Sequence, residues 1–295
     1  MSTLNYLGML YVDFAAQGFY AYLILIISAI FTGILKRTTQ RMPRSTYFLN
    51  TALITFVAGA SQFMWVSVFD AIVSGYVIVI AAADFAVWIG VGYFITMLAK
   101  ARSNDAFGHS RFAPLGFIPI ANFILLLKPS ADRLQNQTAN SAIVGVPAVF
   151  IGFIVLALGR AAGMEAEKAI ERTLAELPQT TSAQRLGMSY FSFYTRRDGL
   201  AEGLGYLASL ERPGQIDEIT RLTAVTVDQS ELTYLFNVTD DTVTHFNPDW
   251  VRSVLVQNCE HYSEVMENGG SVRFVYSSQG QGELGNILAN ADICP

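Results

Sequence analysis

Four long apolar runs dominate the first 160 residues of the chain, and each is predicted to form a helix. About 20 helical residues cross the roughly 30 Å of hydrocarbon in a bilayer, and a helix satisfies its own backbone groups there. The third run is too long for one perpendicular crossing, so either it tilts or a tight turn forms between Asp70 and Tyr76. The four runs are Phe19–Leu35, Tyr47–Phe69, Ala71–Ala99 and Ser141–Gly159.

A fifth apolar run, Phe112–Leu127, is shorter and interrupted. It contains Pro114 and Pro119, and it offers only about 16 residues before Lys128. Runs this short and broken are typical of segments that re-enter the membrane from one side or lie at its surface. The pattern therefore predicts four spans plus one re-entrant or interfacial segment.

The spacing of apolar residues changes after Arg160. Ala166, Ile170 and Leu174 recur at helical intervals, so the last span is predicted to continue as a helical stalk to about Leu177. Residues 179–184 are small and polar, which is typical of a linker.

The remaining residues carry the alternation and turn signals of two hairpins covered by one helix. The helix is predicted to start at Asn247-Pro248-Asp249, an N-cap followed by proline, and to stop at Gly269-Gly270. Its apolar face would include Cys259, Tyr262 and Met266. The predicted strands are Leu222–Val227, Leu232–Val238, Ser271–Tyr276 and Leu284–Leu288.

These patterns predict a membrane α-helical bundle (four spans plus a re-entrant or interfacial segment) followed by a small exported α+β domain. The bundle would occupy residues 1–160, the stalk and linker residues 161–184, and the α+β domain residues 185–295.

Charge is distributed unevenly along the chain. Residues 1–160 hold ten Lys and Arg against five Asp and Glu, whereas residues 161–295 hold nine against nineteen. The basic residues of the first part surround the connection after the first span and the broken fifth run, and by the positive-inside rule both regions are cytoplasmic. Both termini and the α+β domain would then be periplasmic, with the bundle in a bacterial inner membrane.

The two cysteines, Cys259 and Cys294, both fall in the predicted exported domain. Thiols in a compartment without a reducing thiol pool usually pair, so a disulfide is predicted between them. Two independent buried thiols are the alternative.

Two stretches resemble known families. Residues of about 175–294, with Gly214-Gln-Ile-Asp-Glu-Ile-Thr220, Asn258-Cys259 and Asp292-Ile-Cys294, look like a small exported domain of uncharacterised bacterial proteins. Residues 100–130, with Arg102-Ser-Asn-Asp105, Gly108 and Ile118-Pro119, are similar to a loop and Ile-Pro hairpin of small uncharacterised bacterial inner-membrane proteins. The first resemblance implies fold and compartment, the second a cytoplasmic loop packed beside the bundle, and neither implies an activity.

Asp84 is the sharpest candidate for a functional residue. A carboxylate near the middle of a bilayer costs about 2.5–3.5 kcal/mol, so it should face protein or water and find a partner. One interpretation is a proton or cation site. The other is a structural hydrogen bond to the second span, through Asn50, Ser61 or Gln62.

Ala82, Ala86 and Gly90 form a stripe of small residues on the same span. Small residues let membrane helices approach closely, so we expect this stripe to pack inside the bundle rather than form a dimer face.

No catalytic, cofactor or metal motif is found in the sequence, so no cofactor is expected and the protein is predicted not to be an enzyme. The histidines, His109, His245 and His261, share no ligand spacing with an acid or a cysteine. An Asp240-Asp241 pair in a loop could hold a cation, but it is more simply solvated. The acidic second part argues against a nucleic-acid partner.

The resulting functional hypothesis is a non-enzymatic inner-membrane protein that presents a periplasmic interaction domain. Its partners would be membrane lipids and another membrane or periplasmic protein, as for an accessory or assembly subunit of a membrane complex. The alternative is a small transporter or channel component that uses Asp84 and the broken segment Pro114–Leu127.

Overall fold

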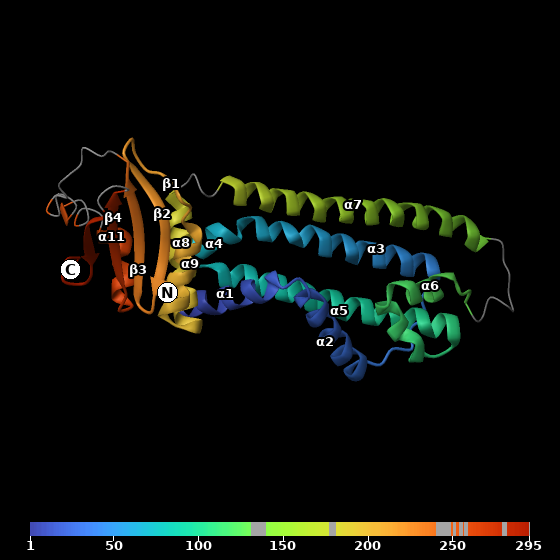
Figure 1. Ribbon diagram of the computed structural model, residues 1–295. Helices are drawn as coiled ribbons and strands as arrows, with labels where there is room; N and C mark the ends of the chain where they lie inside the picture. Colours follow the sequence, from blue (N-terminus) through green and yellow to red (C-terminus); the bar gives the residue numbers. More distant parts are fainter. Residues whose placement is uncertain are drawn as a thin grey trace. The chain divides into compact units, whose positions relative to one another are not determined.

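The computed structural model forms two compact units, Ser2–Pro178 and Gln179–Pro295 (Figure 1). It describes residues 1–130, 140–176, 181–239, 249, 252, 253, 256, 259–278 and 282–294.

Helices are the only regular secondary structure among the described residues of the first unit. Three helical stretches are long and apolar enough to cross a membrane, and a fourth crossing is added if α1 and α2, bent by 100° at their junction, count as one broken span. The three are Arg44–Val73, Val77–Phe107 and Pro147–Thr173. The helices are α1 (Thr3–Ala16), α2 (Tyr20–Leu35), α3 (Arg44–Ser61), the 3₁₀ segment η1 (Gln62–Ser67), α4 (Val68–Val73), α5 (Val77–Phe107), the 3₁₀ segment η2 (Ser110–Phe117), α6 (Pro119–Leu127) and α7 (Asn140–Glu176).

One detail of the predicted spans is corrected and another is confirmed. The first apolar run gives α2, a helix of only 16 residues, and its partner α1 was not predicted because its polar residues hide an apolar face. The long third run does not tilt as one helix. It breaks at Ser74–Tyr76, where Gly75 has a φ of +79°, which confirms the predicted tight turn.

Contacts within the unit fix the direction of each helix. The helices α3 and α7 lie side by side and run the same way, with Phe48 and Phe153 in contact at a ring distance of 5.0 Å and Gly59 against Gly159 farther along (Figure 1). Any Cβ on Gly59 would collide with the Gly159 carbonyl, so glycine is required for this close approach. The end of α5 lies at the start of α3, because Met42 N–H donates to Ala101 O.

The broken segment therefore enters and leaves at one end of the bundle. The end of α5 and the starts of α3 and α7 all lie at that end, and η2 and α6 pack there against them. Leu125 of α6 and Ala113 of η2 are buried with Tyr47 and Ala99 in one apolar cluster. Pro119 occupies the first turn of α6, where a missing N–H costs nothing.

The second unit is a mixed five-stranded sheet with helices on one face. Its strand order is β1-β2-β3-β4-β5, and every neighbouring pair is antiparallel except β3 and β4, which are parallel. The strands are β1 (Gly214–Gln215), β2 (Thr220–Asp228), β3 (Glu231–Val238), β4 (Ser271–Ser278) and β5 (Gly282–Ala289), and the described helices are α8 (Thr181–Asp198), α9 (Leu200–Leu210) and α11 (Cys259–Glu267).

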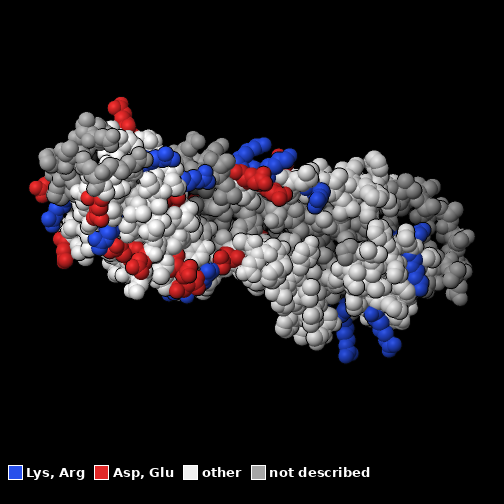
Figure 2. Space-filling model, in the orientation of Figure 1, with Lys and Arg blue, Asp and Glu red and all other residues white. Residues whose placement is uncertain are grey.

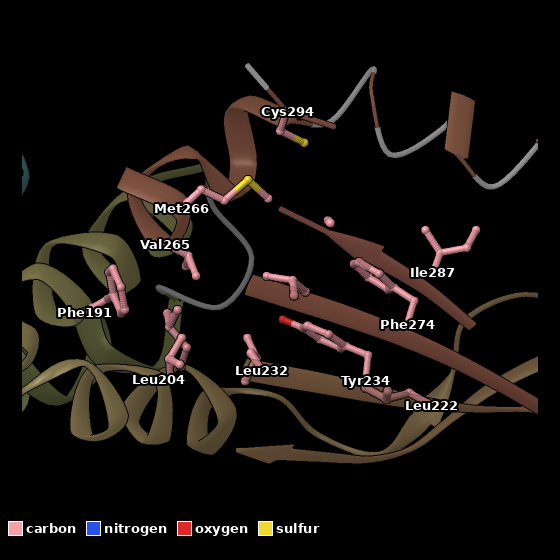
Figure 3. Close-up of a cluster of buried hydrophobic side chains, with 13 residues drawn as sticks. Phe191, Leu204, Leu222, Leu232, Tyr234, Val265, Met266, Phe274, Ile287 and Cys294 are labelled. Atoms are coloured by element: carbon pink, nitrogen blue, oxygen red, sulfur yellow. The ribbon is translucent and has the colours of Figure 1, made fainter. Parts of the chain in front are cut away.

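One apolar core joins the sheet to all three of these helices (Figure 3). Tyr234 and Phe274 stack on neighbouring strands with ring centroids 5.4 Å apart. Phe191 of α8, Leu204 of α9 and Val265 of α11 are fully buried in the same cluster. At about 25 cal/mol for each Å² of apolar surface removed from water, this burial dominates the stability of the unit.

Both predicted hairpins are confirmed, as β2–β3 and β4–β5, and α11 ends before Gly269 as expected. The predicted start of that helix at Asn247-Pro248 lies outside the described residues. The α7 helix continues to Glu176, which confirms that the helix extends past Arg160 as predicted. The linker prediction is wrong over residues 181–184, which form the first turn of α8, and neither α8 nor α9 was predicted.

Candidate functional site

Asp84 lies fully buried in the helical unit and accepts two side-chain hydrogen bonds. The Tyr11 hydroxyl of α1 donates to its Oδ2 at 2.7 Å, and the Trp65 indole N–H of η1 donates to its Oδ1 at 3.2 Å. Each carboxylate oxygen thus has a donor, although no basic residue is involved. This arrangement stabilises a buried acid through neutral hydrogen-bond donors.

Aromatic rings enclose the carboxylate. Tyr11 and Trp65 are stacked with centroids 6.3 Å apart, and Tyr20 packs edge-on against both, at 5.8 and 6.2 Å. The cluster ties α1, α2 and η1 to α5, because each ring comes from a different segment. This geometry supports the structural interpretation of Asp84, in which its carboxylate accepts hydrogen bonds from α1 and η1 and so holds both segments to α5.

The structure gives Asp84 different partners from those expected on the second span. Asn50 lies 15 residues before Trp65, more than about 20 Å along the helix at 1.5 Å per residue. Gln62 is at the right level, but the hydrogen bonds described at Asp84 do not include Gln62 or Asn50, and Ser61 donates to Ala58 O instead. Neither Asn50 nor Gln62 is buried. Tyr11 was missed because a tyrosine outside the long apolar runs gave no signal.

A second polar cluster surrounds Arg102, the largest fully buried side chain of the protein's described part. Its Nε donates to Leu125 O at 2.7 Å, and its other nitrogens reach Lys128 O, Met42 O at 3.4 Å and the carboxylate of Asp105. Two of these carbonyls lie at the end of α6, where helix geometry leaves carbonyls without intrahelical donors. Arg102 therefore caps α6 from inside the bundle.

Neighbouring side chains complete this cluster. Asp105 neutralises Arg102 and accepts from Ser130 Oγ at 2.5 Å. Asn104 donates to Thr38 O and Gln40 O, at 2.8 and 3.1 Å, and so holds the connection between α2 and α3. Helix α5 then ends at Gly108, whose φ of +78° is the left-handed conformation that glycine adopts most readily.

In the sequence, the Arg102–Asp105 spacing contributes to a family resemblance and predicts no site of its own. The four-residue motif places both side chains near one another on the last turns of α5, which a helical wheel predicts. Its role as the cap of a separate helix could not be predicted, because that role depends on where α6 folds back.

The third feature is a groove of about 570 Å³ between α2 and α5. Phe31 and Leu35 line one wall and Ile89 and Tyr93 the other, and Lys36 lies at one end. Two residues of the small-residue stripe line this groove: Ala86 is exposed, and a Cβ on Gly90 would meet nothing within 4 Å. Ala82, the third, is exposed as well. The expected internal packing of the stripe is therefore wrong.

The close contact between α2 and α5 instead uses Gly92, which lies against Leu25 O and the Ser28 side chain. The Ser28 hydroxyl donates to Ile89 O at 2.7 Å across the same contact. Gly92 is offset by two residues from the stripe, and that offset turns the stripe away from the contact.

The C-terminal unit contains the predicted disulfide. Cys259, the first residue of α11, is bonded to Cys294 at the end of the described chain, with Cα atoms 5.3 Å apart. The bond fixes the chain end beside the core that contains Cys294. The predicted bond between Cys259 and Cys294 is confirmed.

The sheet face opposite the helices carries a polar cluster. Arg273 of β4 donates to both carboxylate oxygens of Glu231 on β3, at 2.6 and 2.9 Å, and to Asn286 Oδ1 of β5 at 3.1 Å. The Arg273 hydrogen bonds lower the pKa of Glu231 below its usual value.

Burial lowers the pKa of His261, which lies on α11 beside Tyr262.

Within the described ranges, no group of three His, Cys, Asp or Glu side chains could hold a metal ion. The candidate pair Asp240-Asp241 and the nearby His245 lie outside those ranges. His109 stacks on Phe107, and its carbonyl accepts from Ser103 Oγ at 2.7 Å.

Comparisons with known proteins add little to this geometry. No protein-family model matches the chain, and no curated protein is significantly similar to it. One similar solved structure is a crystal structure described as a "putative secreted protein" from Pseudomonas aeruginosa, with 20% sequence identity and a TM-score of 0.30. The similar region covers 32% of this chain and 92% of the chain in that crystal structure.

Proposed function

We propose that this protein is a multi-pass bacterial inner-membrane protein whose helical unit anchors a disulfide-closed α+β domain in the periplasm. That domain would serve as an interaction module for another membrane or periplasmic protein, as in an accessory or assembly subunit of a membrane complex.

The observation that carries the proposal is the distribution of basic residues over the two ends of the bundle. Three basic residues, Lys36, Arg37 and Arg41, lie between α2 and α3, and Arg44 is the first residue of α3. This is the end of the bundle where α5 stops and α6 folds back. Figure 2 shows Lys and Arg side chains (blue) projecting from this part of the bundle. The positive-inside rule favours a cytoplasmic location for this end.

The start of α1 and the later part of α7 both lie at the opposite end of the bundle. The α7 helix runs parallel to α3 and reaches η1, so it leaves the bundle away from the Arg44 end. At the N-terminal side, Asn5 donates to Ile72 O at 3.4 Å, near the turn between α4 and α5. Lys168 and Arg172 lie farther along α7 among glutamates, past Gly159, where the span predicted from the sequence ends. A periplasmic C-terminal unit is consistent with its disulfide.

In the described part of the bundle, the two buried charged side chains both have hydrogen-bonding partners, which favours anchoring over transport. Asp84 and Arg102 are both buried, and both have their hydrogen-bonding atoms engaged by named partners. The transporter hypothesis remains a separate prediction, and it is tested through Asp84 below.

Topology is tested by labelling engineered thiols with a membrane-impermeant maleimide in intact cells. Asp228→Cys, in the β2–β3 turn, should be labelled after the outer membrane alone is opened. Arg37→Cys, in the connection between α2 and α3, should be labelled only after the inner membrane is broken. The reverse pattern would overturn the proposed orientation and the proposed location of the domain.

The interaction role needs a second experiment. A photo-crosslinking amino acid replacing Thr226, which is exposed on β2, should trap a reproducible protein partner in cells. The same substitution at Glu171, exposed on α7, is the matched control for crowding near the membrane. Equal crosslinking patterns at the two positions would exclude a dedicated partner for this domain surface.

A further inference from the structure

The groove between α2 and α5 is lined almost entirely by carbon. Phe31 and Leu35 of α2 face Ile89 and Tyr93 of α5, and the Ser28 hydroxyl in its wall already donates to Ile89 O. A polar ligand would therefore find few free hydrogen-bonding partners there. An apolar chain would lose nothing on entering, and it would gain close contacts that a flat helix surface does not offer.

The floor of the groove is open because the residues that form it are small. A Cβ placed on Gly90 meets nothing within 4 Å, and Ala86 beside it contributes only a methyl group. Larger residues at these two positions would fill the space. The volume of about 570 Å³ lies within the range of binding pockets rather than of packing defects.

The dimensions of the groove match one leaflet of a bilayer. It extends along α2 from Ile24 to Lys36, which at 1.5 Å per residue is about 18 Å. One leaflet contributes about 15 Å of hydrocarbon. A chain lying in the groove would thus have its polar end at the level of Lys36.

Basic side chains lie at that level. Lys36 is exposed at the end of the groove, and Arg37 beside it is exposed as well. The neighbouring Lys100 is engaged in capping α2, since its Nζ donates to Gly33 O at 2.7 Å and to Lys36 O at 2.6 Å. The combination of an apolar groove and two cations at the headgroup level is complementary to an anionic lipid.

We propose that this groove binds one acyl chain of an anionic phospholipid, with the phosphate-bearing headgroup against Lys36 and Arg37. The site gives the proposed membrane anchor a specific lipid partner, and it rests on the membrane-embedded part of the proposed function. It does not depend on which face of the membrane the C-terminal unit occupies.

The test is native mass spectrometry of the full chain, released from detergent with phosphatidylglycerol or with phosphatidylcholine of identical acyl chains. The wild-type protein should retain one phosphatidylglycerol molecule several-fold better than phosphatidylcholine. Lys36→Gln should lower this preference by about fivefold, the effect expected of one basic residue near a lipid surface. Lys168→Gln, an exposed lysine on α7 outside the groove, is the matched control and should change nothing.

Filling the groove gives an independent readout. Gly90→Leu should abolish retention of both lipids, because its side chain would occupy the space of the acyl chain. Gly163→Leu is the control, since a Cβ there also meets nothing within 4 Å but lies on α7. Equal retention of the two lipids by the wild type, or undiminished retention by Gly90→Leu, would overturn the proposal.

A dimer that disappears only in Gly90→Leu would instead assign the groove to a second copy of the chain. The outcome of the lipid-retention experiment is separable from that of the topology experiment. Reversed maleimide labelling would leave lipid retention unchanged, and lost lipid selectivity would leave the labelling pattern unchanged.

Discussion

The two units of this protein distribute polar and apolar residues in opposite ways. In the helical unit, large apolar side chains such as Ile34, Ile120 and Phe150 are more than two-thirds exposed, whereas Asp84 and Arg102 are completely buried. In the C-terminal unit the buried cluster is apolar, and the ion pair Glu231–Arg273 lies on the open face of the sheet.

This difference teaches what stabilises each unit. Burying apolar surface drives folding in water, but it gives little driving force where lipid is as apolar as the protein. In the proposed membrane location, the helical unit would therefore depend on buried hydrogen bonds and on close glycine contacts. The C-terminal unit depends on its core and its disulfide, so substitutions of equal chemistry should have unequal effects in the two units.

The largest effect is expected at Arg102. Arg102→Gln would leave the partly buried Asp105 without its counter-ion and two α6 carbonyls without donors, a loss of about 3 kcal/mol in the free energy of unfolding. Thermal unfolding in detergent should show the helical unit melting early while the C-terminal unit keeps its transition. The double variant Arg102→Leu with Asp105→Leu should recover part of the loss, and a double variant worse than the single one would contradict this account.

Removing the disulfide should have the next largest effect on stability, and that effect should be confined to the C-terminal unit. Cys259→Ser with Cys294→Ser opens a loop with a sequence separation of 35, for which the chain-entropy model gives about 3–4 kcal/mol. The purified protein should lose stability in its C-terminal transition alone. Reductant should lower the wild-type transition by a similar amount and leave the double variant unchanged.

Substitutions of Asp84 are expected to have a smaller effect on stability and no effect on transport. Asp84→Asn keeps one acceptor oxygen and loses the other, so about 1 kcal/mol should be lost from the helical unit. Asp84→Leu leaves both the Tyr11 and the Trp65 donors without an acceptor and should cost about 2–3 kcal/mol. Proteoliposome flux that falls in Asp84→Asn without a matching loss of stability would favour the transporter hypothesis instead.

The smallest effect concerns the open sheet face. The pKa of Glu231 is lowered by its hydrogen bonds from Arg273, so the pair contributes stability above the ordinary pKa of 4.5. That contribution is lost as the pH falls through the lowered value. Glu231→Gln should destabilise the unit by less than about 1 kcal/mol at neutral pH, with a difference that disappears in acid, as measured by denaturation at pH 7 and pH 3.

Local patterns predicted much of the fold. The two hairpins, the stop of α11 before Gly269 and the turn near Gly75 follow from alternation and from glycine placement, which depend only on neighbouring residues. The helices α8 and α9 were missed because their tyrosine-rich and glycine-containing sequence has low helix propensity. They are helical because Phe191 and Leu204 are buried against the sheet.

The candidate sites were harder to predict than the fold. The sequence identified Asp84 as buried and in need of a partner, because a charge within an apolar run has few alternatives. It did not identify Tyr11 and Trp65 as the donors, and it placed the Ala82–Gly90 stripe inside the bundle. Apolar residues are distributed all round α5, so hydropathy does not define which side of that helix faces a neighbour.

The sequence by itself determined which segments are apolar enough to leave water, which segments form hairpins, and which end of the bundle carries the basic residues. These properties depend on composition and short-range spacing. The tertiary structure alone decided the rotation of α5, the return of α6 onto Arg102 and the open groove beside α2. Those features depend on contacts between segments far apart in the chain, and such contacts leave no periodic signal in the residues that make them.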